Sequence, residues 1–252
     1  MRSFGPSLER RRVRYLLISG QAGILYGAAT FSEDIDIWLD PAPLNVRRFV
    51  QALEDLGARV YKLTPSMTTR NLKRGHGFHF VLPPDEVFLD VMGQPPRVVS
   101  FLASWRRKRW FDSEWGRVPV ICPEDLVELK KTRRSADYDV ISNLVAIRAS
   151  EATGEAKVLQ WALNSTFRVE DLWTFYRRLD RPLRVSRPAA KCFAMGWNRG
   201  ARESCAAALS LEIRQLQELD DQYWSGIIRE LRTFRSVEAL IPPGSPARAV
   251  LA

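Results

Sequence analysis

The sequence predicts an α/β protein: a mixed β-sheet flanked by helices in its first part, and helices alone in its second part. Over residues 15–150, short apolar or alternating segments of strand length recur between segments whose apolar residues repeat at helical spacing. Beyond residue 150 only the helical spacing remains. The chain has 252 residues and 46% apolar content, which is enough for one large or two small domains with a buried core.

We therefore expect three spans along the chain. Residues 1–150 form the α/β domain, and the polar stretch around Gly154 marks its end. Residues 151–240 form a helical domain. Residues 241–252, which are rich in proline, are expected to be a disordered tail.

Composition limits the classes of function. A formal net charge of +9 favours polyanionic partners such as nucleic acid or nucleotides, although a basic protein without such a partner stays possible. Three cysteines without metal-ligand spacing and two histidines argue against a zinc site, a disulfide framework and a Ser-His-Asp triad. The sequence contains no cleavable leader and no apolar run of membrane-spanning length, so we expect a cytoplasmic protein.

The stretch from Tyr15 to Asp40 carries the strongest local pattern. Residues 15–18 read as a buried strand, Ser19-Gly20 breaks the run, and residues 21–28 have the spacing of a short helix. Residues 34–39 then alternate acidic and apolar side chains, as in a strand with one wet face. Asp34 and Asp36 therefore project from the same face.

Two carboxylates held this close on one strand repel each other, and a divalent cation would relieve the repulsion. Ligand sets made only of oxygen favour Mg²⁺ or Mn²⁺. The pattern thus predicts a metal site at Asp34 and Asp36.

A third acidic residue follows in a predicted hairpin. We expect a helix over residues 44–56, a strand over 59–63, a mobile polar loop over 64–73, and paired strands at 77–82 and 86–92. Asp90 lies among apolar residues near the end of the last strand. A lone buried carboxylate is costly, so Asp90 requires a partner or a function.

Basic residues gather in two later segments. A helix expected over residues 98–110 ends in a block of Arg106, Arg107, Lys108 and Arg109 between two tryptophans, which suits contact with phosphates and bases. A solvated basic face with the tryptophans packed inward is the equal alternative. A strand at 118–121 precedes a helix over 123–132, and four further helices are expected at 158–163, 169–179, 201–219 and 223–234.

The ordered set of Gly turn, Asp-x-Asp strand, third Asp and Lys-bearing helix resembles the DNA polymerase β-type nucleotidyltransferase superfamily, and most closely the bacterial AbiEii-like, toxin-type small nucleotidyltransferases. The resemblance covers a little over half of the chain. Here Gln21 replaces the second small residue of the turn.

The resemblance implies a nucleotidyltransferase fold in the first domain and a role for each matching residue. Asp34, Asp36 and Asp90 would be catalytic residues that hold two Mg²⁺ or Mn²⁺ ions. Nucleoside triphosphate would contact the turn and the later helix, through Ser19, Gly20, Gln21, Lys130, Arg134 and Asp137.

The predicted activity is transfer of a nucleoside monophosphate from a triphosphate to an acceptor hydroxyl. RNA, especially a tRNA end, is the first expectation, with nucleic-acid contacts at the basic block and a cognate antitoxin as a possible partner. A small molecule or a protein side chain is the alternative acceptor. A nucleic-acid-binding module on a degenerate transferase scaffold is the alternative without catalysis.

Overall fold

The computed structural model describes residues 4–98, 100–152, 154–179, 187–236 and 240–251; the ends of the predicted spans at residues 1–3 and 252 lie outside them. The chain divides into two compact units. The first comprises Met1–Leu25, Thr30–Leu129 and Tyr223–Ala252, and the second comprises Tyr26–Ala29 and Lys130–Gln222. The compact units divide near residues 129 and 222, and the predicted domain boundaries near residues 150 and 240 stay a prediction. The separate folding of the predicted domains stays a proposal.

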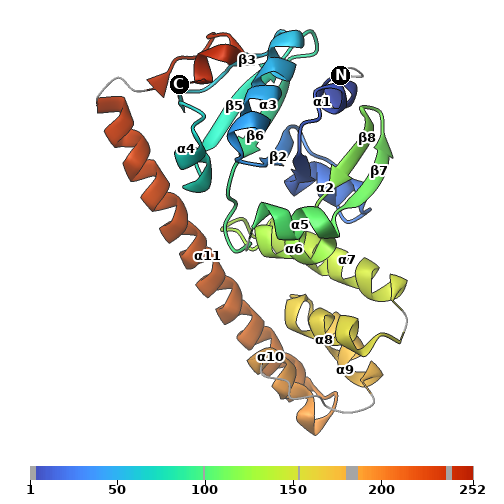
Figure 1. Ribbon diagram of the computed structural model, residues 1–252. Coiled ribbons are helices and arrows are strands. Elements are labelled where there is room, and N and C mark those ends of the chain that lie inside the picture. The colour runs from blue at the N-terminus through green and yellow to red at the C-terminus, as the bar shows by residue number, and fades with distance from the viewer. Residues whose placement is uncertain (1–3, 99, 153, 180–186, 237–239, 252) are drawn as a thin grey trace. The chain divides into compact units, whose positions relative to one another are not determined.

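The first unit is built on a seven-stranded mixed sheet (Figure 1), which confirms the predicted α/β class. Strand β1 pairs antiparallel with β2 and parallel with β8, while β2 pairs parallel with β6. In sheet order the strands are β3 (Arg59–Val60), β5 (Gly77–Leu82), β6 (Val87–Met92), β2 (Ile35–Leu39), β1 (Tyr15–Ile18), β8 (Gly116–Val120) and β7 (Arg109–Ser113).

Helix α3 covers one face of this sheet because its apolar side chains lie on one side. Phe49 of α3 packs edge-on against Phe80 of β5, with ring centroids 6.3 Å apart. Phe80 therefore projects toward α3, and its neighbour His79 projects from the opposite face. The helices of this unit are α1 (Phe4–Arg10), α2 (Ser19–Leu25), α3 (Pro43–Asp55), α4 (Thr69–Lys73), α5 (Phe101–Arg107) and α6 (Pro123–Leu129), and the unit ends with the last part of α11.

Two segments predicted to lack structure are ordered, and the predicted disorder of residues 241–252 is wrong for 241–251. Strand β9 (Leu240–Ile241) pairs with β4 (Thr64–Pro65) inside the loop expected at 64–73. A 3₁₀ helix, η2 (Ala247–Val250), buries Val250, whose carbonyl accepts a hydrogen bond from the Met67 amide at 2.7 Å. These contacts were not predicted because the two segments lie about 180 residues apart in the sequence.

The second unit is helical, and its first helix is α7 (Ala136–Glu151). Its other elements are α8 (Ala156–Ser165), α9 (Val169–Arg178), α10 (Pro188–Lys191), the 3₁₀ helix η1 (Cys192–Met195) and the first part of α11 (Arg199–Ser236). Helix α11 is one continuous element of 38 residues where two helices were predicted. Within the described residues, no helix has the length and apolar character needed to cross a membrane.

Candidate active site

Three aspartates meet on the sheet of the first unit. Asp36 lies on β2, Asp34 directly precedes that strand, and Asp90 lies on β6. The parallel register places Asp36 directly beside Asp90. One carboxylate oxygen from each of the three residues lies within 4.8 Å of the others. The cluster predicted from the sequence is therefore present.

Strand alternation explains why these side chains share one half-exposed face. Ile35 and Ile37, on either side of Asp36, are fully buried, as are Leu89 and Val91 on either side of Asp90. Their burial holds both strands in register, and the intervening aspartates must then project from the face opposite α3. The rigid sheet therefore positions the carboxylates and prevents them from moving apart.

The Asp90 carboxylate is held by two side chains through a single oxygen. Tyr61 donates its hydroxyl to Oδ1 at 2.9 Å, and His79 Nδ1 lies 2.8 Å from the same atom. An ionised carboxylate only accepts hydrogen bonds, so Nδ1 of His79 carries the proton. Burial opposes ionisation of Asp90, but the bonds from His79 and Tyr61 outweigh it and lower the pKa of the carboxyl. Among the described residues, Oδ2 of Asp90 accepts no hydrogen bond.

The chemistry of this donor set fits a divalent cation. Two unit charges 4.8 Å apart repel by about 1 kcal/mol in water and by about 3–4 kcal/mol at the effective dielectric of a protein surface. Three such charges on one rigid face thus favour a bound cation. Carboxylate oxygens without nitrogen or sulfur ligands select Mg²⁺ or Mn²⁺.

The turn after β1 adjoins these carboxylates. Ile18 pairs with Asp36 across the sheet, so the following Ser19 and Gly20 begin α2 beside the cluster. Ser19 has a φ of 58°, a strained conformation for a non-glycine residue. A side chain at Gly20 would collide with the Ser32 hydroxyl, so the close approach here requires glycine.

Gln21 has a structural contact that explains its presence in the turn. Its side-chain amide donates to the backbone carbonyl of Ser32 at 3.3 Å. The Ser32 hydroxyl in turn lies 3.3 Å from Oδ1 of Asp34. Gln21 therefore braces the loop that carries the first aspartate, and the binding of phosphate by the turn stays a prediction.

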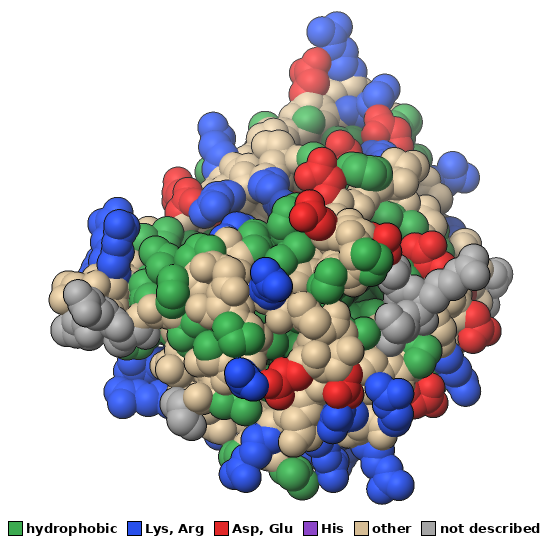
Figure 2. All heavy atoms as spheres, turned by 90° about the horizontal axis from the view of Figure 1, so that it is seen from above, with side chains coloured by type: hydrophobic (Ala, Val, Ile, Leu, Met, Phe, Trp, Pro, Cys, Tyr) green, Lys and Arg blue, Asp and Glu red, His purple; other side chains and the backbone are tan. Residues whose placement is uncertain are grey.

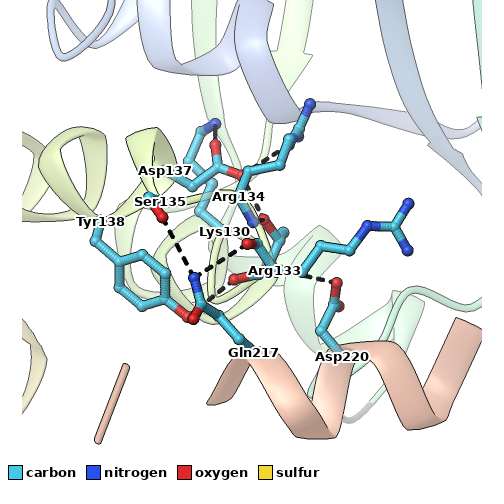
Figure 3. A network of polar contacts seen from close by, with 9 residues as sticks. Lys130, Arg133, Arg134, Ser135, Asp137, Tyr138, Gln217 and Asp220 are labelled. Carbon is cyan, nitrogen blue, oxygen red and sulfur yellow. Dashed lines mark hydrogen bonds and ion pairs between the residues drawn. The ribbon is translucent and has the colours of Figure 1, made fainter. Parts of the chain in front are cut away.

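In the second unit, Lys130 belongs to a buried polar network (Figure 3). Its ammonium donates to Oδ1 of Asp137 at 2.9 Å. Oδ2 of Asp137 accepts from the Thr132 hydroxyl at 2.6 Å and from Arg134 Nε at 3.1 Å. Burial opposes ionisation of Asp137, but the charge of Lys130 and the bond from Thr132 lower its pKa.

Helix α11 closes the same network from its other side. The backbone amide of Arg133 donates to the buried carboxylate of Asp220 at 3.1 Å, and the Gln217 side chain donates to the Arg133 carbonyl at 3.0 Å (Figure 3). The turn carrying Lys130 and Arg134 is therefore ordered by the protein itself. The contact of these residues with nucleotide stays a prediction.

The basic block differs from its predicted form. Helix α5 ends at Arg107, and Arg109 already belongs to strand β7, so the helix predicted to extend to residue 110 is wrong. Arg107 donates to Asp125 at 2.6 Å. Lys108 Nζ lies 4.0 Å from the Trp105 ring centroid and 5.5 Å from that of Trp110. Arg107 and Lys108 therefore have partners within the protein.

Three residues of the site, His79, Tyr61 and Thr132, were not predicted from the sequence. Only His79 had a local signal, which is the register of the predicted hairpin. His79 pairs directly with Asp90 across the β5–β6 hairpin, and the predicted turn between these strands implies that register. Tyr61 follows β3 and reaches Asp90 from outside the hairpin. Thr132 reaches Asp137 across a turn that no periodic pattern marks.

No family model and no curated protein matches the chain. A solved structure that is similar is the lincosamide antibiotic adenylyltransferase LnuA with bound lincomycin. It is 20% identical and aligns with a TM-score of 0.39 over 56% of this chain and 90% of the other. This likeness is too weak to assign a function to the chain.

Proposed function

We propose that the protein is a metal-dependent nucleotidyltransferase that moves a nucleoside monophosphate from a triphosphate to an acceptor hydroxyl. The observation that carries the proposal is the carboxylate cluster: Asp34, Asp36 and Asp90 converge from two adjacent parallel strands, with oxygens within 4.8 Å. The sequence resemblance to polymerase β-type enzymes supports it. The finer resemblance to AbiEii-like enzymes stays a prediction.

In the proposed reaction the acceptor oxygen bonds to the α-phosphorus, the bond to the bridging oxygen breaks, and pyrophosphate leaves. Two divalent cations, held by Asp34 and Asp36 with Asp90 on one of them, would supply charge neutralisation for the triphosphate and the acceptor oxygen. Tyr61 and His79 hold Oδ1 of Asp90. Oδ2 of Asp90 is therefore the atom that we assign to its cation, whose charge would let the acceptor hydroxyl release its proton to solvent.

Ser19, Gly20 and Gln21 are proposed to adjoin the phosphates of the nucleotide. Lys130, Arg134 and Asp137 are proposed as further nucleotide-binding residues on the strength of the sequence resemblance. Asp137 takes one of the three ammonium protons of Lys130, so two remain for phosphate oxygens. Lys130→Ala should weaken triphosphate binding more than Lys131→Ala, which a fluorescent-nucleotide titration would measure.

For the acceptor we place a small molecule ahead of RNA, the reverse of the order that net charge favoured. Arg107 and Lys108 of the basic block contact Asp125 and two tryptophans. On the face drawn in Figure 2, the described Lys and Arg side chains are interspersed with acidic and hydrophobic ones and form no continuous basic surface. A protein side chain as acceptor, a cognate antitoxin and a non-catalytic nucleic-acid-binding module stay predictions.

The test is incubation with each α-³²P-labelled triphosphate, Mg²⁺, and either total RNA or a panel of hydroxylated small molecules. Label transferred by the wild type and not by Asp36→Asn supports the proposal. No transfer to any acceptor, together with unchanged triphosphate binding after metal removal, would contradict it. An RNA acceptor would also show steep weakening of binding with salt, and a small molecule would not.

A further inference from the structure

An aromatic side chain is exposed beside the carboxylate cluster. Phe88 of β6 leaves 42% of its surface accessible, whereas its strand neighbours Leu89 and Val91 are fully buried. It lies two positions before Asp90 on the same face of the strand, so the two residues are about 6.6–6.8 Å apart along the chain. The exposed part of the Phe88 ring does not pack within the chain. It lies close to three carboxylates, where a ligand could contact it.

Tyr61 supports Phe88 from one side. The two ring centroids lie 4.7 Å apart at an interplanar angle of 45°. Tyr61 is itself held by its hydrogen bond to Asp90, and Lys62 Nζ lies 4.6 Å from the centroid of its ring. Phe88 is therefore backed by an anchored ring. We call Phe88 and Tyr61 the aromatic platform.

The order of the strands decides which substrate the platform could meet. Strand β6 lies on one side of β2, and β1 with its Ser19–Gly20 turn lies on the other. If the triphosphate lies against that turn, the platform borders the opposite side of the cluster. That side is where the acceptor hydroxyl must approach Asp90.

We propose that the aromatic platform binds a planar ring of the acceptor. The ring would stack on Phe88, and the reacting hydroxyl of the same molecule would lie at Asp90. This inference rests on the proposed transferase function. The acceptor class is a hydroxylated molecule that carries a planar ring, either an aryl glycoside or a nucleoside.

The test measures binding of matched ligands to the full chain without triphosphate. The first pair is 4-nitrophenyl β-D-glucoside against methyl β-D-glucoside, and the second is adenosine against methyl β-D-riboside. Each pair shares its sugar hydroxyls and differs in the ring. We expect a ring-bearing compound to bind at least about tenfold more tightly than its methyl partner in ligand-observed NMR titrations, as stacking on an aromatic side chain provides.

Variants at Phe88 link that preference to the platform. Phe88→Ala should weaken binding of the ring-bearing ligand about tenfold, and Phe88→Trp should retain it. Leu44→Ala, which alters an exposed apolar residue of α3, should change nothing and serves as the matched control. Thermal melting of each variant establishes that it folds. Preferential binding of adenosine and of the trinucleotide CCA would assign the ring to RNA, and preferential binding of the nitrophenyl glycoside would assign it to a small molecule.

Two results would overturn the platform: equal binding of ring-bearing and methyl compounds, or ring binding unchanged in Phe88→Ala. The proposed function fails in a different way. Nucleotide transfer that is unchanged in Phe88→Ala would contradict the platform and support the transferase function. Ring binding that requires Phe88, in a protein that transfers no nucleotide, would contradict the transferase function and support a ring-binding site.

Discussion

The carboxylate cluster of the first unit and the Lys130 network of the second unit differ in how their charges are balanced. The cluster brings three aspartates together, and the two donors that reach Asp90 share one of its oxygens. The Lys130 network surrounds one aspartate with three donors, which occupy both of its oxygens. Both groups lie on ordered elements, so the difference is one of charge and not of order.

This difference separates a group of like charges, which favours a cation from solvent, from a pair of opposite charges that balance each other. A cation from outside the chain would relieve the mutual repulsion of the three carboxylates. The charge of Asp137 is already balanced by Lys130, and the pair is buried. Removing a charge should therefore have opposite effects on stability at the two places, which the following predictions use.

The largest effect is expected for loss of an aspartate from the cluster. Asp36→Asn should lower nucleotide transfer by about 10³-fold or more, because it removes a ligand and a charge from the reacting centre. Its melting temperature without metal should stay equal or rise, because repulsion is relieved. Asp112→Asn, an exposed aspartate on β7 of the same sheet, is the control and should change neither quantity. Transfer that persists in Asp36→Asn would refute the assignment.

A loss of stability is expected when the buried pair of the second unit is broken. Asp137→Leu should lower the free energy of unfolding by about 3–5 kcal/mol, because it leaves the Lys130 ammonium buried without a counter-charge. The double variant Lys130→Met, Asp137→Leu should recover part of this loss. Urea denaturation of the three proteins measures both quantities. A cost below about 1 kcal/mol for Asp137→Leu would show that solvent reaches the pair.

A smaller effect is expected for the residues that orient Asp90. Tyr61→Phe removes the hydroxyl bond to Oδ1 and keeps the ring, so it should weaken Mn²⁺ binding about tenfold, the lower limit for loss of a residue behind a metal ligand. Electron paramagnetic resonance of free Mn²⁺ measures this affinity without requiring activity. Tyr26→Phe alters a tyrosine of the second unit and is the control. Equal affinities in the three proteins would reduce Tyr61 to a packing residue.

The smallest effect concerns how the free energy of unfolding falls at acid pH. The pKa of Asp137 is lower in the folded protein than the ordinary value near 3.9, so its ionised form stabilises the fold above about pH 5. That contribution is lost as the pH falls through the folded-state pKa. The free energy of unfolding should therefore fall less steeply with acid in Asp137→Asn than in the wild type. An equal dependence of the free energy of unfolding on acid pH in the two proteins would contradict the lowered pKa of Asp137.

Much of the candidate site was accessible before the structure because its signals are local. Alternation placed Asp34 and Asp36 on one face, and an acidic residue among apolar neighbours marked Asp90. The partners of Asp90 were missed for different reasons: His79 follows from the hairpin register that the sequence implies, whereas Tyr61 lies outside the hairpin, directly after β3. The extent of helix α5 was wrong because a pattern of basic and aromatic residues does not distinguish the end of a helix from the start of a strand.

The sequence by itself determined the type of most elements and the shared face of the first two aspartates, since both depend on the period of a few adjacent residues. Only the tertiary structure decided that β2 lies parallel to β6 with Asp36 beside Asp90, and that β9 pairs with β4. It also decided that Lys130 is buried against Asp137. Pairings between distant segments depend on the packing of the whole core and on chain connections, which no local pattern encodes.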